Sequence, residues 1–184
     1  MEHRRDDENG ARRGTERPPT GGRKIALRHS TGGRECAISL HRMDIELREI
    51  TAHTVRDICA LEVAEDQRNF VAPNAVSIAE AHFEPQHWMR AIYADGRPVG
   101  FVLAWEPGGT AFLWRFMIAE PDQGKGIGRR AMELVIEHWR ETGATAAKTS
   151  VVPGNAGATA LYEAVGFALT GDTDAGELVM ARAL

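Results

Sequence analysis

The sequence is poor in cysteine and has no long hydrophobic run. Its two cysteines, Cys36 and Cys59, lie in very different local sequences. Two such cysteines do not make a disulfide framework, so we expect a reducing, cytoplasmic setting. The longest apolar run, Val99–Trp105, falls far short of the ~20 residues that cross a bilayer. The sequence therefore predicts no membrane-spanning helix.

Signatures of metal sites and of nucleic-acid binding are also missing. The seven histidines show no metal-ligand spacing, and Cys59 falls on the apolar face of an expected helix. We therefore expect no metal. Basic residues near the N-terminus are interleaved with acidic ones and have no aromatic neighbours, which argues against a nucleic-acid partner.

Residues 1–42 differ in composition from the rest of the chain. They carry ten Lys or Arg against six Asp or Glu, with two Gly-Gly pairs, Pro18-Pro19 and few large apolar side chains. Such a segment cannot bury enough apolar surface to fold, so we predict a disordered, charged tail before a domain at 43–184. No apolar stretch of a secretory leader follows its arginines. Met43 is an alternative start of the natural chain. Because the whole chain carries −4, the domain carries −8.

A glycine-rich stretch is the most informative part of the sequence. It follows a buried-strand pattern at 111–118 and precedes a helical pattern of apolar residues that includes Ala131 and Val135. Glycines let a backbone approach an anion, and the first N–H groups of a helix have no internal partners. We therefore predict a pyrophosphate site. The stretch reads Gln123, Gly124, Lys125, Gly126, Ile127, Gly128, and Arg129 follows it.

Two common phosphate loops do not match this stretch. A P-loop continues from Gly-Lys into Ser or Thr, whereas Lys125 is followed by Gly126. A dinucleotide fingerprint needs Gly-x-Gly-x-x-Gly and an acidic residue about 20 residues further on, and both are missing. A simple glycine-rich turn before a helix is the alternative. A second motif downstream favours the binding site.

The second motif runs from Asn155 to Phe167, and together the two motifs resemble the GNAT family of acetyl-CoA-dependent N-acetyltransferases. That family's cofactor loop, Gln/Arg-x-x-Gly-x-Gly/Ala, is matched at Gln123, Gly126 and Gly128. The resemblance extends from about Asp44 to the C-terminus. The family's later helix, Asn-x-x-Ala-x-x-Leu-Tyr-Glu-x-x-Gly-Phe, is matched at Asn155, Ala158, Leu161, Tyr162, Glu163, Gly166 and Phe167.

The expected elements follow the order of a GNAT fold. The resemblance implies an α+β fold with a mixed, mostly antiparallel sheet of about seven strands, splayed between strands 4 and 5 and flanked by about four helices. Asp95-Gly96 predicts a hairpin turn, and Asn74 is the expected cap of a short helix. We expect strands at 45–50, 89–94, 98–106, 111–118, 147–152, 167–170 and 177–183, and helices at 51–61, near 76–81, after 126 and from 155.

The resemblance also implies where acetyl-CoA lies as co-substrate. The backbone of Phe116, Met117 and Ile118 would pair with the pantetheine arm like an added strand, and an N–H near Met117 would polarise the thioester carbonyl. The amides of 124–129 would hold the pyrophosphate. Lys125 and Arg129 either add charge near the phosphates or are a solvated basic pair. Asn155 would bind the pantetheine, cap its own helix, or do both.

Tyr162 is the predicted catalytic residue. Attack of an amine on a thioester yields a tetrahedral intermediate that expels a thiolate, and a nearby phenol can give that group a proton. Packing on the apolar stripe of its helix is the alternative role. No general base is assigned. The strand at 114–116 has no carboxylate, and the candidates by position alone are Glu80, Glu84, Glu106 and Glu120.

Residues 65–74 and 113–118 resemble the bacterial spermine/spermidine acetyltransferase subgroup, which implies a polyamine acceptor. A polyamine needs carboxylates at amine spacing and an apolar slot. The alternatives are another amine (an amino acid, an aminoglycoside, a protein N-terminus or a lysine) or a non-catalytic CoA-binding regulatory module. Dimers are common among such relatives, so the resemblance is compatible with a homodimer. Candidates for lining the slot are Glu62, Glu65, Asp66, Glu80 and Glu84 as acids and Trp88, Trp105 and Trp114 as walls.

Overall fold

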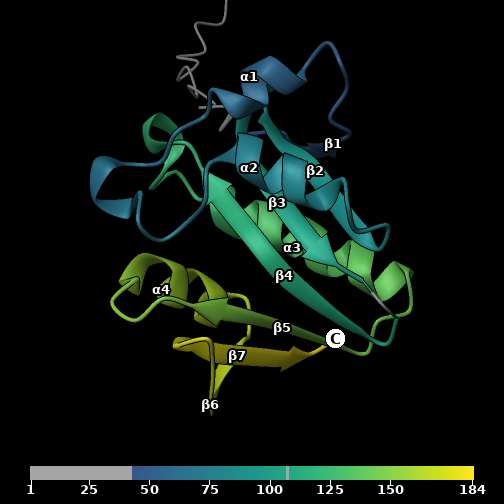
Figure 1. The fold of residues 1–184 in the computed structure, drawn as a ribbon, viewed down its shortest axis with the longest axis vertical. Coiled ribbons are helices and arrows are strands. Elements are labelled where there is room, and N and C mark those ends of the chain that lie inside the picture. Colours follow the sequence, from purple (N-terminus) through teal and green to yellow (C-terminus); the bar gives the residue numbers. More distant parts are fainter. Residues whose placement is uncertain (1–42, 107) are drawn as a thin grey trace, which may run out of the picture. The chain divides into compact units, whose positions relative to one another are not determined.

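In the part of the chain that the computed structural model describes, residues 43–106 and 108–184, seven strands form one mixed sheet (Figure 1). The predicted tail at 1–42 lies outside the described residues. The sheet order is β1-β2-β3-β4-β5-β7-β6, and β4 and β5 are its only parallel pair within this range. The strands are β1 Ile45–Arg48, β2 His87–Ala94, β3 Arg97–Trp105, β4 Thr110–Ile118, β5 Ala146–Val151, β6 Ala168–Asp174 and β7 Glu177–Ala183.

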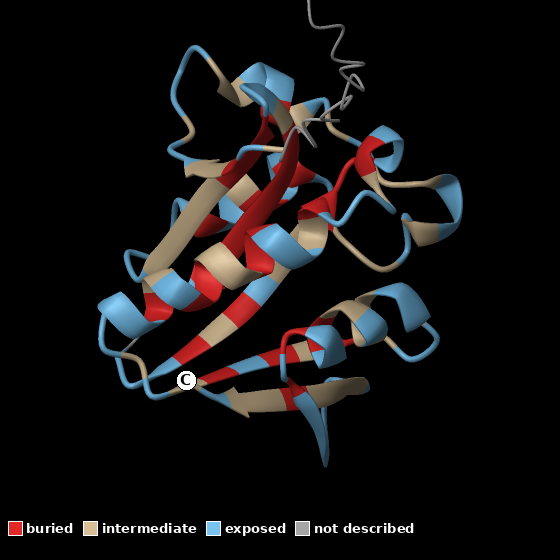
Figure 2. Cartoon of the chain, turned by 180° about the vertical axis from the view of Figure 1, so that it is seen from behind, coloured by how far each residue is buried: buried red, intermediate tan, exposed pale blue. Residues whose placement is uncertain are grey.

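Helices cover both faces of the sheet (Figures 1 and 2). Helices α1 and α2 pack on one face around Ile58 and Phe101, and α3 and α4 pack on the other around Val135 and Tyr162. No helix among the described residues is long and apolar enough to cross a membrane. The predicted α+β architecture, with a mixed, mostly antiparallel sheet of seven strands and four helices, is confirmed for the described residues. The helices are α1 Val55–Cys59, α2 Asn74–Ala81, α3 Ile127–Glu141 and α4 Ala156–Ala164, with short 3-10 turns η1 Glu65–Gln67 and η2 Glu120–Asp122.

Two local predictions differ from the structure. The helix expected at 51–61 is reduced to α1, because the Thr51 N–H bonds the Thr54 hydroxyl at 2.9 Å in a turn that precedes the helix. Asn74 was the expected cap of α2, and this prediction is wrong. Its side chain instead donates to the Ile58 carbonyl at 2.8 Å, so it ties α2 to α1.

The two central strands separate at a defined point. β4 pairs with β5 only over Thr110–Leu113, and the Thr149 hydroxyl donates to the Leu113 carbonyl at 3.2 Å where the pairing ends. On the other side of β4, the register with β3 shifts so that Trp114 is an extra residue. A bulge of this kind bends its strand, which accounts for β4 turning away from β5 after Leu113.

Candidate active site

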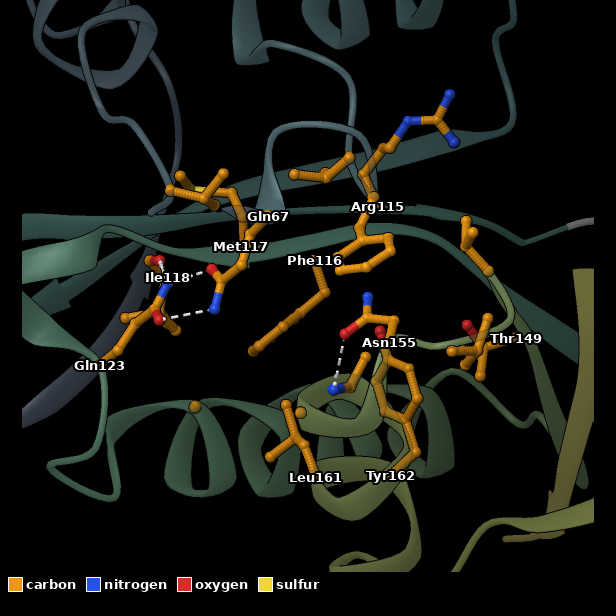
Figure 3. Close-up of a pocket in the computed structure, with 18 of the residues that line it drawn as sticks. Gln67, Arg115, Phe116, Met117, Ile118, Gln123, Thr149, Asn155, Leu161 and Tyr162 are labelled. Atoms are coloured by element: carbon orange, nitrogen blue, oxygen red, sulfur yellow. Dashed lines mark hydrogen bonds between the residues drawn. The ribbon is translucent and has the colours of Figure 1, made fainter. Parts of the chain in front are cut away.

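A cavity of about 710 Å³ opens where β4 and β5 separate (Figure 3). Its walls come from the loop before α2, the second half of β4, the glycine stretch with the first turn of α3, and β5 with α4. The structure therefore brings both sequence motifs to one place. The predicted site residues that line it are Phe116, Met117, Ile118, Gln123, Gly124, Gly126, Gly128, Arg129, Asn155 and Tyr162.

The glycine stretch forms the start of α3. Gly126 has φ 79° and occupies the N-cap position without a side-chain cap, and a Cβ added there would meet no atom within 4 Å. The first N–H groups of the fifteen-residue α3 have no partner within the helix, and the helix dipole is positive at this end. This end of the cavity thus has room and donors for an anionic group.

Lys125 and Ile127, which belong to the predicted cofactor set, do not line the cavity. Ile127 is buried in the core under the sheet, and the Lys125 ammonium pairs with Asp122 at 3.0 Å. Asp122 also accepts two hydrogen bonds from the Arg97 guanidinium, both at 2.8 Å. These bonds, with that from Lys125, hold the pKa of Asp122 down at about 2 against the opposing effect of burial.

Gln123 fixes the position of the glycine stretch. Its Nε2 donates to the Ile118 carbonyl and to Gln67, both at 2.8 Å, and its Oε1 accepts from Gln67 at 3.0 Å. Both N–H bonds of the amide are used inside the protein. The side chain thus joins the end of β4 to the segment at η1, and any hydrogen bond it donates to a cofactor would require breaking one of these.

Asn155 and Tyr162 lie on the opposite wall, in α4. Asn155 caps this helix by accepting from the Ala158 N–H at 3.1 Å. Tyr162 is 6% exposed and has its ring 5.9 Å from that of Phe167, so it packs in the core as well as lining the cavity. Burial raises the pKa of Tyr162 to about 12, the charge of Glu177 acts in the same direction, and a hydrogen bond with Thr149 opposes it. The phenol is therefore protonated at neutral pH and can act as a donor.

None of the acids suggested for an amine slot lines the cavity. Glu62 and Glu65 each pair with Arg68 at 2.9 Å, and Glu80 approaches Arg115 at 3.6 Å. Asp66, Glu84 and Glu120 also lie outside the lining. Glu106 lies outside as well, where it accepts a hydrogen bond from Trp139 Nε1 at 2.8 Å.

Of the three candidate tryptophans, Trp114 alone lines the cavity. Trp88 stacks on His138 of α3 with the ring centroids 4.2 Å apart, and the Trp105 indole N–H donates to the Gln86 side-chain oxygen. The one acid that does line the cavity among the described residues is Glu177, which no sequence motif predicted and which accepts a hydrogen bond from the Ser150 hydroxyl. Within the described ranges, no group of three His, Cys, Asp or Glu side chains is arranged to hold a metal ion.

Comparisons with known proteins show the family and the fold. The model of the Acetyltransferase (GNAT) family matches residues 47–167. A spermine/spermidine N(1)-acetyltransferase of Bacillus subtilis is 28% identical over 152 residues, which cover 77% of this chain and 100% of that protein. Two solved structures share the fold. One is spermidine N-acetyltransferase from Vibrio cholerae in complex with CoA and spermine (TM-score 0.61, 18% identity, 76% of this chain and 95% of that one). The other is the ribosomal-protein-S18-alanine N-acetyltransferase from Escherichia coli (TM-score 0.59, 19% identity, 76% and 94%).

Proposed function

Because the chain belongs to the acetyltransferase (GNAT) family, we propose that it moves the acetyl group of acetyl-CoA to a primary amine of a small polyamine such as spermidine or spermine. The observation that carries the proposal is the cavity itself. It joins uncapped helical N–H groups at the start of α3 to the buried phenol of Tyr162, across the gap between β4 and β5.

The proposed acetyl-CoA site uses three parts of the chain. The N–H groups of 127–129 and the open backbone at Gly126 suit the pyrophosphate. Beyond Leu113, the edge of β4 that faces the cavity has no β5 partner, so its amide groups are available to the pantetheine arm. An N–H near Met117 would stabilise the oxyanion that forms when the amine attacks the thioester.

Tyr162 is proposed to give its proton to the departing thiolate. The phenol keeps its proton at neutral pH and lines the cavity, so it can donate a hydrogen bond to the sulfur while the C–S bond breaks. Thr149 lines the same cavity, and its hydroxyl donates to the Leu113 carbonyl where the strands separate.

A polyamine is the proposed acceptor because the Bacillus relative acts on spermine and spermidine and aligns over its whole length. The negative charge of 43–184 also favours a cationic substrate. The fold alone does not choose among acceptors, since the two solved structures have similar TM-scores and different substrates.

A thiol-release assay with acetyl-CoA across a panel of amines tests the proposal. We expect spermidine and spermine to be turned over faster than lysine, an aminoglycoside or a peptide with a free N-terminus. The rate should rise with pH, because only the unprotonated amine attacks. Clear activity on another amine with none on polyamines would support acetyl transfer but reject a polyamine as the acceptor. No thiol release with any amine would reject the transfer as well.

A further inference from the structure

Among the described residues, every charged side chain that lines the cavity has a partner of opposite charge outside it, with one exception. Each of the three lining arginines pairs with an acid that does not line the cavity. Glu177, the one lining acid among the described residues, has the Ser150 hydroxyl as its polar partner, and no cation in that part of the chain pairs with it. An anion without a counter-ion favours a cationic ligand. The arginine pairs are Arg68 with Glu62 and Glu65 at 2.9 Å, Arg115 with Glu80 at 3.6 Å and Arg129 with Glu133 at 3.4 Å.

The register of β5 and β7 determines the face on which Glu177 lies. Ser150 of β5 pairs with Val179 of β7, and Glu177 precedes Val179 by two residues. Side chains two apart in a strand share a face, so Ser150 and Glu177 are diagonal neighbours. Thr149 precedes Ser150 and points to the opposite face, which it shares with Val151, a member of the same core cluster as Tyr162 of α4.

The two sides of the gap therefore differ in chemistry. The start of α3 and Tyr162 lie on the face that α3 and α4 cover, as Figure 2 shows for these helices. Glu177 lies on the other face, on which α1 and α2 pack over the first part of the sheet. An amine that attacks a thioester held in the gap needs an approach that the pyrophosphate loop does not occupy, and the side of Glu177 provides one.

We infer that Glu177, held by Ser150, binds the ammonium group of the acceptor amine. The inference rests on the proposed acetyl transfer and adds the residue that positions the acceptor. A carboxylate forms strong, charge-assisted hydrogen bonds with an ammonium group. Glu177 and Tyr162 line the same cavity, so an amine bound to the carboxylate shares this cavity with the proposed proton donor.

The test is Glu177→Gln, which keeps an acceptor for the Ser150 hydroxyl and removes the charge. With the amine that wild type uses best, kcat/KM should fall about 10- to 100-fold, the range that loss of one hydrogen bond to a charged group covers. The fall should appear mainly as a higher KM for the amine. The KM for acetyl-CoA and its thermal shift should stay as in wild type, which a general structural defect would not allow. Ser150→Ala, which leaves the carboxylate but frees it to rotate, should give a smaller fall in the same direction.

Asp174→Asn is the matched control. Asp174 stands opposite Glu177 in the β6–β7 hairpin but is exposed and does not line the cavity, so its loss should not change the KM for the amine. An unchanged kcat/KM in Glu177→Gln would overturn the inference while acetyl transfer by wild type stands. A lower kcat with an unchanged KM would also overturn it, because it would make the carboxylate a proton acceptor and not an anchor. If the wild-type protein were inactive with every amine, the proposed function would be rejected, and the proposed role of Glu177 would be rejected with it.

Discussion

Tyr162 is buried in the core and also lines the cavity. The hydroxyl is protonated at neutral pH, as in any tyrosine, and burial raises its pKa further, to about 12. Tyr162→Phe keeps the ring and its packing against Phe167 but removes the proton. Turnover should fall roughly 10²–10⁴-fold with little change in acetyl-CoA affinity, since one positioned acid is lost.

The protein's other tyrosine gives the control for this prediction. Tyr93 is also buried, at 7% exposure, but lies in β2 and away from the cavity. Tyr93→Phe should leave turnover unchanged. Steady-state kinetics of the two variants distinguish a proton donor from a packing residue. Equal turnover by Tyr162→Phe and wild type would show that Tyr162 only packs.

Asp122 supports the site without lining it. Asp122→Asn loses the charge that two exposed cations share, so the free energy of unfolding at pH 7 should fall by about 1–2 kcal/mol. Because the folded state lowers this pKa from 3.8 to about 2, the stabilisation is complete above the unfolded value and is lost as the pH falls towards the folded one.

Denaturant unfolding at a series of pH values measures this effect. The difference between wild type and Asp122→Asn should be constant near neutral pH and shrink below about pH 4, as far down as both remain folded. A difference that stays the same across the acid range would mean that the Asp122 charge does not stabilise the fold.

At the scale of elements, the start of α3 carries the prediction for acetyl-CoA. Gly126→Val places a branched side chain in the open space at the end of the cavity and strains a backbone at φ 79°. The thermal shift that acetyl-CoA gives to wild type should be lost. Gly143→Val is the matched control for Gly126→Val. Gly143 has φ 85° and equally open surroundings, and it lies just after the other end of α3.

Gly143→Val should lower the melting temperature by a similar amount and keep the shift. Its thermal denaturation with and without acetyl-CoA therefore separates strain from blocked binding. If Gly126→Val kept the full shift, the cofactor assignment to this loop would fail.

Much of the site could be predicted because its two motifs are local. Strand, glycines and helix follow one another in sequence, and Asn155 caps the helix that it precedes. The hairpin turn at Asp95-Gly96 has positive φ at both residues, as its composition predicts. Each of these features depends on neighbours along the chain. Periodicity and residue type were sufficient to find the glycine stretch and the hairpin turn, whereas the role of Asn155 followed from the resemblance to a family.

The residues that sequence analysis missed depend on contacts between distant segments. Glu177 reaches the cavity only because β7 pairs with β5 in one register, and a shift of one residue would turn it to the other face. The partner of Asp122, Arg97 of β3, is 25 residues away in the sequence. Asn74 failed as a cap for the same kind of reason, since the Ile58 carbonyl of α1 takes its side chain.

At the scale of the whole molecule, the sequence predicts that residues 1–42 are not needed for folding or for acetyl transfer. A chain that starts at Met43 keeps both motifs and all the described residues that line the cavity. It should match the full chain in melting temperature and in turnover. A melting temperature several degrees lower in the shorter chain would show that the N-terminal segment packs on the domain.

The central claim is that acetyl-CoA and the amine meet from opposite faces of the sheet, in the gap between β4 and β5. A crystal structure of the protein with CoA and spermidine tests this most directly. The account predicts the pyrophosphate against the N–H groups of 127–129, the sulfur beside Tyr162 and an ammonium group against Glu177. CoA bound anywhere other than this gap, or both ligands on one face of the sheet, would contradict it.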